Sequence, residues 1–175
     1  MSREFSVVAH RGYSSRAPEN TLAAFERAIE SGADMIEIDI TLSEDGHFIV
    51  IHDDTLDRTT DGRGFVAHHS LEQIRRLDSG SWYSAEFTGQ RLLTINEVLE
   101  KIAPRIGLNI EIKPLFTLTA VSKLLVAIHK LVKDVESIGL TDTILFSSFN
   151  FFVLEHLRSL SANVRLGVLY CHPFS

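Results

Sequence analysis

Short apolar runs alternate with longer amphipathic runs along most of this chain. Six of the apolar runs have the length and side-chain character of buried β-strands: residues 5–10, 35–42, 48–53, 107–113, 142–149 and 165–170. The longer runs have helical spacing, which predicts helices within residues 18–34, 94–103, 117–139 and 150–160. Strands that alternate with helices in this way predict a mostly parallel sheet.

Local signals mark where several of these elements begin and end. Asn20 or Thr21 is a suitable cap for the first helix, and Gly32 is a suitable end for it. The segment SEDGH (43–47) predicts a short turn between the second and third strands. Residues 54–91 are polar and rich in Gly, Asp and Thr, with one short helical piece, LEQIRRL, so we expect an insertion or a long loop there.

The order of the elements fits either a doubly wound α/β sheet or a TIM-type (β/α)8 barrel. A complete barrel of this type usually needs about 250 residues, and the chain has 175. If the fold is a barrel, we therefore expect the chain to end after the sixth strand, without the last quarter of the barrel. No linker or low-complexity segment divides the sequence, so residues 1–175 are expected to form a single domain.

The composition narrows the classes of partner and location. The net charge of −6 argues against nucleic acid or an anionic membrane as the main partner, while a small anionic substrate stays compatible with a locally basic site. Cys171 is the single cysteine, which excludes an internal disulfide and suits a reducing compartment. The first residues lack the apolar core of a secretory signal, and the apolar segment 117–135 is too charged to span a bilayer. We therefore expect a cytoplasmic protein.

Ionisable residues lie near the ends of four of the predicted strands. Side chains two positions apart share a face of a strand, so Glu37 and Asp39 lie on one face and the neighbouring isoleucines on the other. In α/β folds, functional sites form beyond the carboxyl ends of parallel strands. The residues that we expect at such a site are His10, Glu37, Asp39, His52, Glu111 and Lys113.

Three of these residues predict a metal site. Converging carboxylates repel one another and shift their pKa values unless a cation lies among them. Glu37, Asp39 and Glu111 carry the oxygen ligands that Mg²⁺ and Ca²⁺ prefer. We therefore expect a divalent cation, with coordination positions left for water or substrate.

The remaining residues favour phosphoryl transfer to water. His10 and His52 are suited to proton transfer near neutral pH. Arg11 and Lys113 add fixed positive charge, which suits a phosphate group. Together with a metal, this set predicts a hydrolase in which one histidine acts as a base and the other protonates the leaving alcohol.

Each of these features has a simpler explanation when it is taken alone. Acidic residues in a strand could face solvent at a sheet edge, a histidine could lie on a surface turn, and a lysine could simply end a strand. Their recurrence at four strand ends favours a common site. Trp82, Tyr83 and Phe87 fit two roles, as the lining of a substrate entrance or as a small core of the insertion. The other histidines are interpreted as surface or packing residues: His47, His68, His69, His129, His156 and His172.

Several motifs in a fixed order resemble the glycerophosphodiester phosphodiesterase family, particularly its bacterial cytoplasmic members. The motifs are HRG at 10–12, PENT at 18–21, EIDI at 37–40, HDDTLDRTTDGRG at 52–64, EIK at 111–113 and TILFSSFN at 143–150. The resemblance implies a TIM-type barrel with a small insertion after the third strand. It also implies Mg²⁺- or Ca²⁺-dependent hydrolysis of glycerophosphodiesters to glycerol 3-phosphate and an alcohol.

Carried over residue by residue, the resemblance implies a role for each candidate. His10 and His52 match the acid–base pair, and Arg11 and Lys113 match the phosphate contacts. Glu37, Asp39 and Glu111 match the metal ligands. Two alternatives stay open: a related phosphodiesterase on the same scaffold that acts on lipids, or an inactive, truncated fragment. A barrel that stops after six strands would also expose sheet edges through which copies of the chain could associate.

Overall fold

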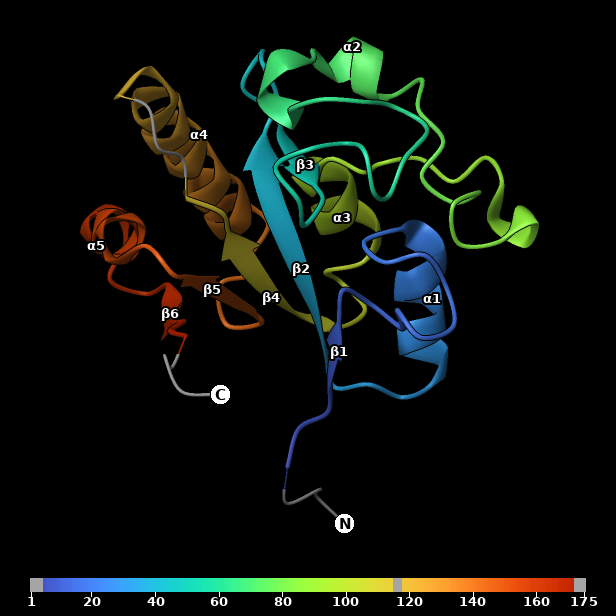
Figure 1. Ribbon diagram of the computed structural model, residues 1–175. Helices are drawn as coiled ribbons and strands as arrows, with labels where there is room; N and C mark the ends of the chain where they lie inside the picture. Colours follow the sequence, from blue (N-terminus) through green and yellow to red (C-terminus); the bar gives the residue numbers. More distant parts are fainter. Residues whose placement is uncertain (1–4, 115–117, 172–175) are drawn as a thin grey trace.

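The computed structural model describes residues 5–114 and 118–171, with only the backbone of residues 118–120. Its centre is a curved, six-stranded sheet (Figure 1). Five strands pair in parallel, in the order β1 (Val8–His10), β2 (Met35–Leu42), β4 (Gly107–Ile112), β5 (Ile144–Ser148) and β6 (Arg165–Val168). The sixth strand, β3 (Phe48–Val50), has β2 as its neighbouring strand and runs antiparallel to it.

The helices follow the strands in the alternation that the sequence predicts. The longer ones are α1 (Leu22–Glu30), α3 (Ile95–Lys101), α4 (Leu118–Ser137) and α5 (Phe151–Leu160). The predicted insertion contains the short helices η1 (Val66–His68), α2 (Leu71–Ile74) and η2 (Ala85–Phe87). Thr21 caps α1, because its side chain accepts a hydrogen bond from the backbone of Ala24. Of the two candidate caps, the structure therefore selects Thr21.

One strand differs from its predicted extent. The strand predicted over residues 48–53 ends at Val50 and is the second arm of a hairpin with β2. The chain nevertheless continues beside β2, because the Ile51 amide donates a 3.0 Å hydrogen bond to the carbonyl oxygen of Asp39. His52 therefore follows the strand instead of lying within it, and the parallel series contains five of the six predicted strands.

The apolar face of the sheet packs against the helices. Ile36, Ile38 and Ile40 of β2 are fully buried in one hydrophobic cluster. The same cluster contains Leu108, Ile110 and Ile112 of β4, Val98 of α3, Ile128 of α4 and Leu157 of α5. Burying a side chain of this size contributes roughly 1.5–3 kcal/mol. This packing leaves the alternate residues of β2 and β4 on the opposite face, where the acidic side chains lie.

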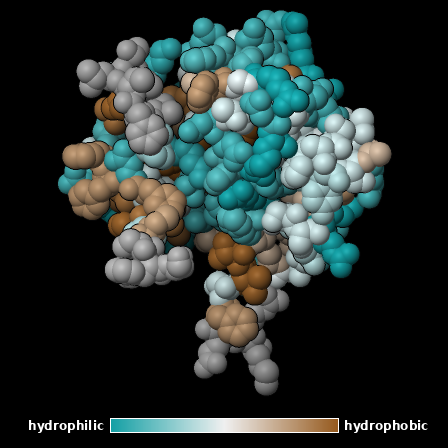
Figure 2. Space-filling view, viewed as in Figure 1, coloured by the Kyte–Doolittle hydropathy of each residue, from teal (hydrophilic) through white to brown (hydrophobic). Residues whose placement is uncertain are grey.

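The two edge strands of the sheet carry exposed apolar residues. Val8 of β1 is 47% exposed, and Val168 of β6 is 65% exposed. Figure 2 shows hydrophobic surface over α5 and β6 and near β1, with hydrophilic surface between them. Within the described residues β1 and β6 do not pair with each other, so the sheet is open. No helix in the described part of the chain combines the length and hydrophobicity needed to cross a membrane.

Candidate active site

The strand register brings the predicted acidic residues together. Asp39 of β2 lies directly beside Glu111 of β4, and Glu37 lies beside His10 of β1. In a parallel pair, residues side by side project from the same face. One carboxylate oxygen from each of Glu37, Asp39 and Glu111 lies within 4.8 Å of the others, and all three residues are buried. The structure therefore confirms that these three side chains converge.

The environment of the three carboxylates fits a hard cation. Glu37 Oε1 is buried and has no hydrogen-bond partner among the described residues. A buried carboxylate oxygen without a partner is costly, and a divalent cation is a suitable partner for it. Burial and the nearby charge of Asp39 raise the pKa of Glu37 to about 8. The site can therefore hold a metal ion, and without one it favours a protonated Glu37 at neutral pH.

This raised pKa predicts how the stability of the cation-free protein depends on pH. Below the ordinary glutamate pKa of 4.5, Glu37 is protonated in both the folded and the unfolded chain. Between 4.5 and about 8 the folded chain binds this proton and the unfolded chain does not, so the Glu37 contribution falls as pH rises. We expect urea midpoints measured in EDTA to show this fall, and saturating Mg²⁺ or Ca²⁺ to reduce it. Glu37→Gln should remove the fall of the urea midpoint with pH in EDTA. A fall that persists in this variant would contradict the prediction.

Two basic side chains compensate part of the acidic charge. Lys113 Nζ lies 2.6 Å from Glu111 Oε1 and 2.9 Å from Asp39 Oδ1. Burial opposes the charged ammonium, but the hydrogen bonds to both carboxylates outweigh it and raise the pKa of Lys113. Arg11 Nε lies 3.4 Å from Asp39 Oδ2. In this arrangement both predicted phosphate contacts are paired with acidic groups of the site.

The turn after β1 places Arg11 by an unusual backbone conformation. Arg11 and Gly12 have φ values of +58° and +80°, in the left-handed region that side chains disfavour. This conformation directs the Arg11 amide at Glu37, whose Oε2 accepts a 3.0 Å hydrogen bond. A Cβ atom on Gly12 would lie 2.8 Å from the backbone of Ala24 in α1. The HRG motif therefore needs a glycine at its third position for conformation and for space.

A pair of substitutions separates these two requirements. Gly46 has a similar φ of +82°, and a Cβ atom there would have no neighbour within 4 Å. We expect Gly46→Ala to cost about 1 kcal/mol, from backbone strain alone. Gly12→Ala adds the clash with α1 and should cost about 3 kcal/mol or more. Urea unfolding of the two variants measures the difference, and equal losses would show that α1 moves away freely.

Of the two predicted acid–base residues, His10 lies beside the acidic cluster and His52 lies near His10. His10 Nε2 is 3.8 Å from Glu37 Oε2, and the His10 side chain is 67% exposed. Burial of part of the ring, together with Arg11, lowers the pKa of His10, and the charge of His52 contributes in the same direction. His52 Nδ1 is 2.7 Å from Asp53 Oδ1. The structure thus brings all seven predicted residues to one region, and their individual roles stay predictions.

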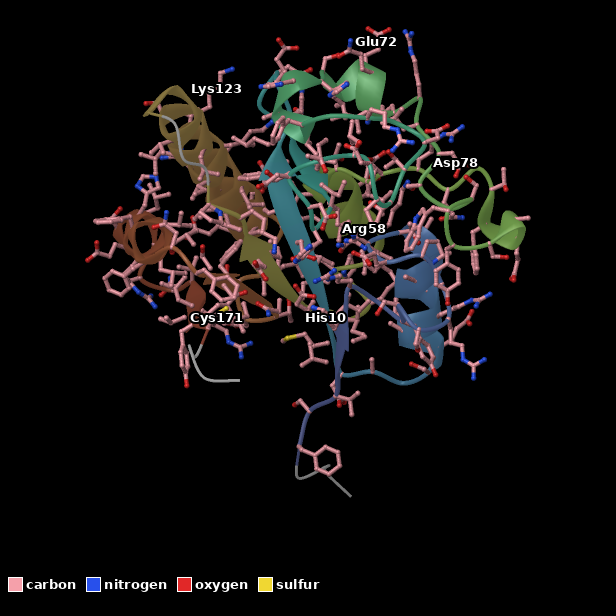
Figure 3. The ribbon with its side chains drawn as sticks, in the orientation of Figure 1. His10, Arg58, Glu72, Asp78, Lys123 and Cys171 are labelled. Atoms are coloured by element: carbon pink, nitrogen blue, oxygen red, sulfur yellow. The ribbon has the colours of Figure 1, made fainter. Side chains whose placement is uncertain are left out.

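Four polar residues near these side chains were not among the site residues that the sequence predicts. Asn20 Nδ2 donates a 3.0 Å hydrogen bond to Asp39 Oδ2. The other three, Glu19, Asp53 and Arg58, form a chain of ion pairs that connects the turn after β1 with the loop after β3. Figure 3 labels His10, the last residue of β1, and Arg58, in the loop after β3. All four lie inside the PENT and HDDTLDRTTDGRG motifs, and that position was the available signal.

The aromatic residues of the insertion pack mainly against one another. Tyr83 makes edge-to-face contacts with Trp82 and with Phe87, at centroid distances of 5.7 and 5.6 Å. Phe87 is buried against α1, and the Arg27 guanidinium lies 4.9 Å from its ring centre. Trp82 and Tyr83 stay partly exposed. Phe87 is buried, as the small-core interpretation expects, but its apolar neighbours Ala17 and Ala24 lie outside the insertion.

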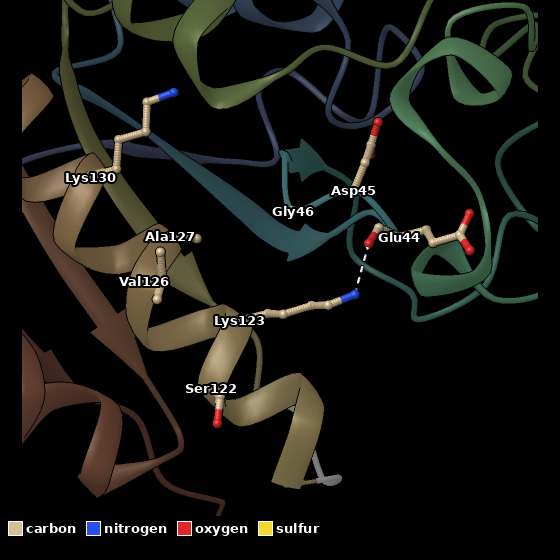
Figure 4. Close-up of a pocket in the computed structure, with 8 residues that line it drawn as sticks. All are labelled: Glu44, Asp45, Gly46, Ser122, Lys123, Val126, Ala127 and Lys130. Carbon is tan, nitrogen blue, oxygen red and sulfur yellow. Dashed lines mark hydrogen bonds between the residues drawn. The ribbon is translucent and has the colours of Figure 1, made fainter.

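A separate pocket lies between the β2–β3 turn and α4 (Figure 4). It has a volume of about 610 Å³, and its polar lining includes Asp45, Lys123 and Lys130. Lys123 Nζ donates a 3.0 Å hydrogen bond to the backbone carbonyl of Glu44 across it. None of the seven candidate residues lines this pocket, so the candidate active site is a different surface.

Two curated relatives match most of the chain. A protein of Caldanaerobacter subterraneus subsp. tengcongensis named glycerophosphodiester phosphodiesterase is 43% identical over 94% of this chain and 66% of its own length. A Bacillus altitudinis protein of the same name is 34% identical over 93% of this chain and 65% of its own. The chain therefore spans about two thirds of the length of these relatives.

Solved structures and a family model agree with this result. A phosphodiesterase of Oleispira antarctica, solved with the product sn-glycerol-3-phosphate, superposes with a TM-score of 0.84 at 37% identity and covers 94% of this chain and 65% of its own. A glycerophosphodiester phosphodiesterase of Agrobacterium tumefaciens superposes with a TM-score of 0.81 at 35% identity. This match covers 92% of this chain and 65% of that protein. The superpositions confirm a TIM-type barrel fold, of which the described residues form an open part. Residues 10–173 match the model of the glycerophosphoryl diester phosphodiesterase family. The chain belongs to this family.

Proposed function

We propose that this protein hydrolyses glycerophosphodiesters to glycerol 3-phosphate and an alcohol, with a divalent cation. The observation that carries the proposal is the convergence of three buried carboxylates on one face of the sheet, with two histidines nearby. Membership of the family and the product bound in the Oleispira antarctica structure support the substrate class.

Glu37, Asp39 and Glu111 would hold the cation, Mg²⁺ or Ca²⁺. Their three carboxylates are a hard-oxygen donor set, and Glu37 Oε1 lacks another partner among the described residues. When bound, the cation would polarise the phosphoryl oxygens as a Lewis acid. It would also take over charge compensation that Lys113 now supplies. Lys113 and Arg11 would then bind the phosphate oxygens and orient the phosphorus for attack.

His10 and His52 would move the two protons of the reaction. One ring removes a proton from the attacking hydroxyl, either water or the glycerol hydroxyl of the substrate itself. The other ring donates a proton to the oxygen of the leaving alcohol as its bond to phosphorus breaks. Attack by the glycerol hydroxyl would give a cyclic phosphate, which water then opens with the proton transfers repeated.

An enzyme-coupled assay for glycerol 3-phosphate tests the proposal. We expect release from glycerophosphocholine with Mg²⁺ or Ca²⁺ and none with EDTA. No release at high protein concentration, from a sample with folded circular dichroism, would favour the inactive alternative. Release of choline from lysophosphatidylcholine, without release of glycerol 3-phosphate from glycerophosphocholine, would favour the lipid-specific alternative.

We also propose that the open sheet edges allow the chain to associate with itself. The support is the exposed apolar surface at both edges, with Phe152 of α5 78% exposed and Phe5, before β1, 72% exposed. Sedimentation velocity at several protein concentrations should show species larger than one chain. A monomer throughout this series would refute the proposal.

For the whole chain, we propose one domain in the cytoplasm. Ile49 of β3 shares a hydrophobic cluster with Leu56, Val66 and Ile74 of the insertion, which supports one folding unit. The single cysteine, Cys171, is free and exposed, which suits a reducing compartment. Trp82 lies in the insertion and is the only tryptophan. Its fluorescence and far-UV circular dichroism should therefore report one common unfolding transition.

A further inference from the structure

We infer that Arg58 is a positioning residue that holds both sides of the active site through two carboxylates. Glu19 transmits its effect to Arg11, and Asp53 transmits its effect to His52. This inference rests on the proposed function, because it assigns Arg58 an effect on residues that act in that reaction. It does not assign Arg58 any contact with substrate.

The guanidinium of Arg58 makes two paired sets of hydrogen bonds. Its Nη1 and Nη2 donate to the two carboxylate oxygens of Glu19, each at 2.8 Å. Its Nε and Nη2 donate to the two oxygens of Asp53, at 2.7 and 2.9 Å. A planar guanidinium can bind two carboxylates in this way, whereas a lysine ammonium cannot reproduce the geometry.

The first arm of the network ends at Arg11. Glu19 Oε1, which Arg58 contacts, also accepts a 2.9 Å hydrogen bond from Arg11 Nη1. The Glu19 side chain is 13% exposed, so its carboxylate has little freedom to turn toward water. Burial opposes its ionisation, but the hydrogen bonds from Arg58 and Arg11 outweigh this and lower the pKa of Glu19. Arg58 therefore keeps an ionised carboxylate in position to hold the Arg11 side chain beside Asp39.

The second arm ends at His52. The hydrogen bonds from Arg58, despite partial burial, lower the pKa of Asp53 well below its usual range, so Asp53 is ionised and can only accept hydrogen bonds. Its Oδ1, 2.7 Å from His52 Nδ1, therefore places a proton on Nδ1. The neutral ring then has Nε2 available as the basic nitrogen, which fixes both its tautomer and its orientation.

The network joins two segments that lie far apart in the sequence. Glu19 and Arg58 are 39 residues apart in the sequence, in the loops that follow β1 and β3. The Arg58 side chain is 42% exposed, so its ion pairs should add little to global stability. A loss of Arg58 should therefore affect the geometry of the site more than the fold.

The test compares Arg58→Gln and Arg58→Lys with a matched control, Arg63→Gln. Arg63 lies in the same loop, is 81% exposed and makes one long contact of 3.6 Å, with Asp57. Imidazole ¹⁵N chemical shifts of the cation-free protein, at about pH 8 where an ordinary histidine is neutral, report the His52 tautomer. We expect protonation at Nδ1 in the native protein and in Arg63→Gln, and a mixture of tautomers in Arg58→Gln.

Kinetics with glycerophosphocholine and Mg²⁺ give the second measurement. We expect kcat to fall about 10- to 100-fold in Arg58→Gln, Arg58→Lys to recover little of it, and the Mg²⁺ affinity to change less than about 2-fold. Asp53→Asn, which keeps Glu19 paired with Arg58, should mix the His52 tautomers as well and serves if Arg58→Gln does not fold. An unchanged His52 tautomer in a folded Arg58→Gln protein, or in Asp53→Asn, would overturn the inference. A native protein without turnover would instead refute the proposed function, and the tautomer comparison would still decide the network.

Discussion

Glu111→Gln is expected to abolish cation-dependent turnover while leaving the cation-free protein at least as stable at neutral pH. Glu111 supplies one of three carboxylates that can hold the cation, and a neutral amide is a much weaker ligand. We expect Mg²⁺ affinity to fall at least about 100-fold and kcat/KM at least about 1,000-fold, because several kcal/mol of charge stabilisation are lost. The charge of Glu111 also helps to raise the pKa of Glu37, so its removal lowers the free-energy cost of keeping Glu37 protonated at neutral pH in the folded chain. Calorimetric titration, the coupled assay and urea unfolding in EDTA measure the three effects.

The opposite signs of these effects distinguish a metal ligand from a structural residue. A residue needed for folding would lower both stability and activity when it is replaced. Glu100→Gln is the control, since Glu100 is an exposed residue of α3 and is not part of the acidic cluster. It should leave Mg²⁺ affinity and turnover within about 2-fold of the native protein. If Glu111→Gln behaved like this control, the three-carboxylate site would be wrong.

The strand-borne part of the site could be predicted because its geometry follows from short sequence periods. Glu37 and Asp39 share a face since side chains alternate along a strand, and Glu111 joins them since neighbouring strands run parallel. The isoleucines between the acids settle which face is buried against the helices. These arguments need only the strand assignments, which the structure confirms.

The part of the site that lies in loops could not be predicted, because loops have no such sequence period. Arg58 meets Glu19 because the loops after β1 and β3 return to the same place, and no local period encodes this closure. The apolar run of β3 alone does not give the direction of the strand, because a run of this length fits a parallel strand as well as a hairpin arm. The turn SEDGH is the local signal for the hairpin, because a connection this short joins antiparallel strands, whereas a parallel crossover needs a dozen or more residues.

His52→Ala is expected to lower kcat about 100- to 10,000-fold and to leave Mg²⁺ affinity unchanged. A positioned acid or base typically contributes a factor of this size. His52 does not belong to the acidic cluster, so the three carboxylates keep their arrangement. The control is His47→Ala, at an exposed position of the β2–β3 turn, which should retain the native rate. A His52→Ala protein with the native kcat would show that His52 has no acid–base role.

A double substitution then tests whether Asp53 acts through His52. In the native background Asp53→Asn removes the acceptor that places a proton on His52 Nδ1, and kcat should fall. In the His52→Ala background the same change has no ring to orient, so it should cause little further loss of kcat. Losses that multiply in the double variant would mean that Asp53 contributes independently of His52. If the double variant loses little more kcat than His52→Ala alone, Asp53 and His52 act as one functional unit, which Arg58 holds in position.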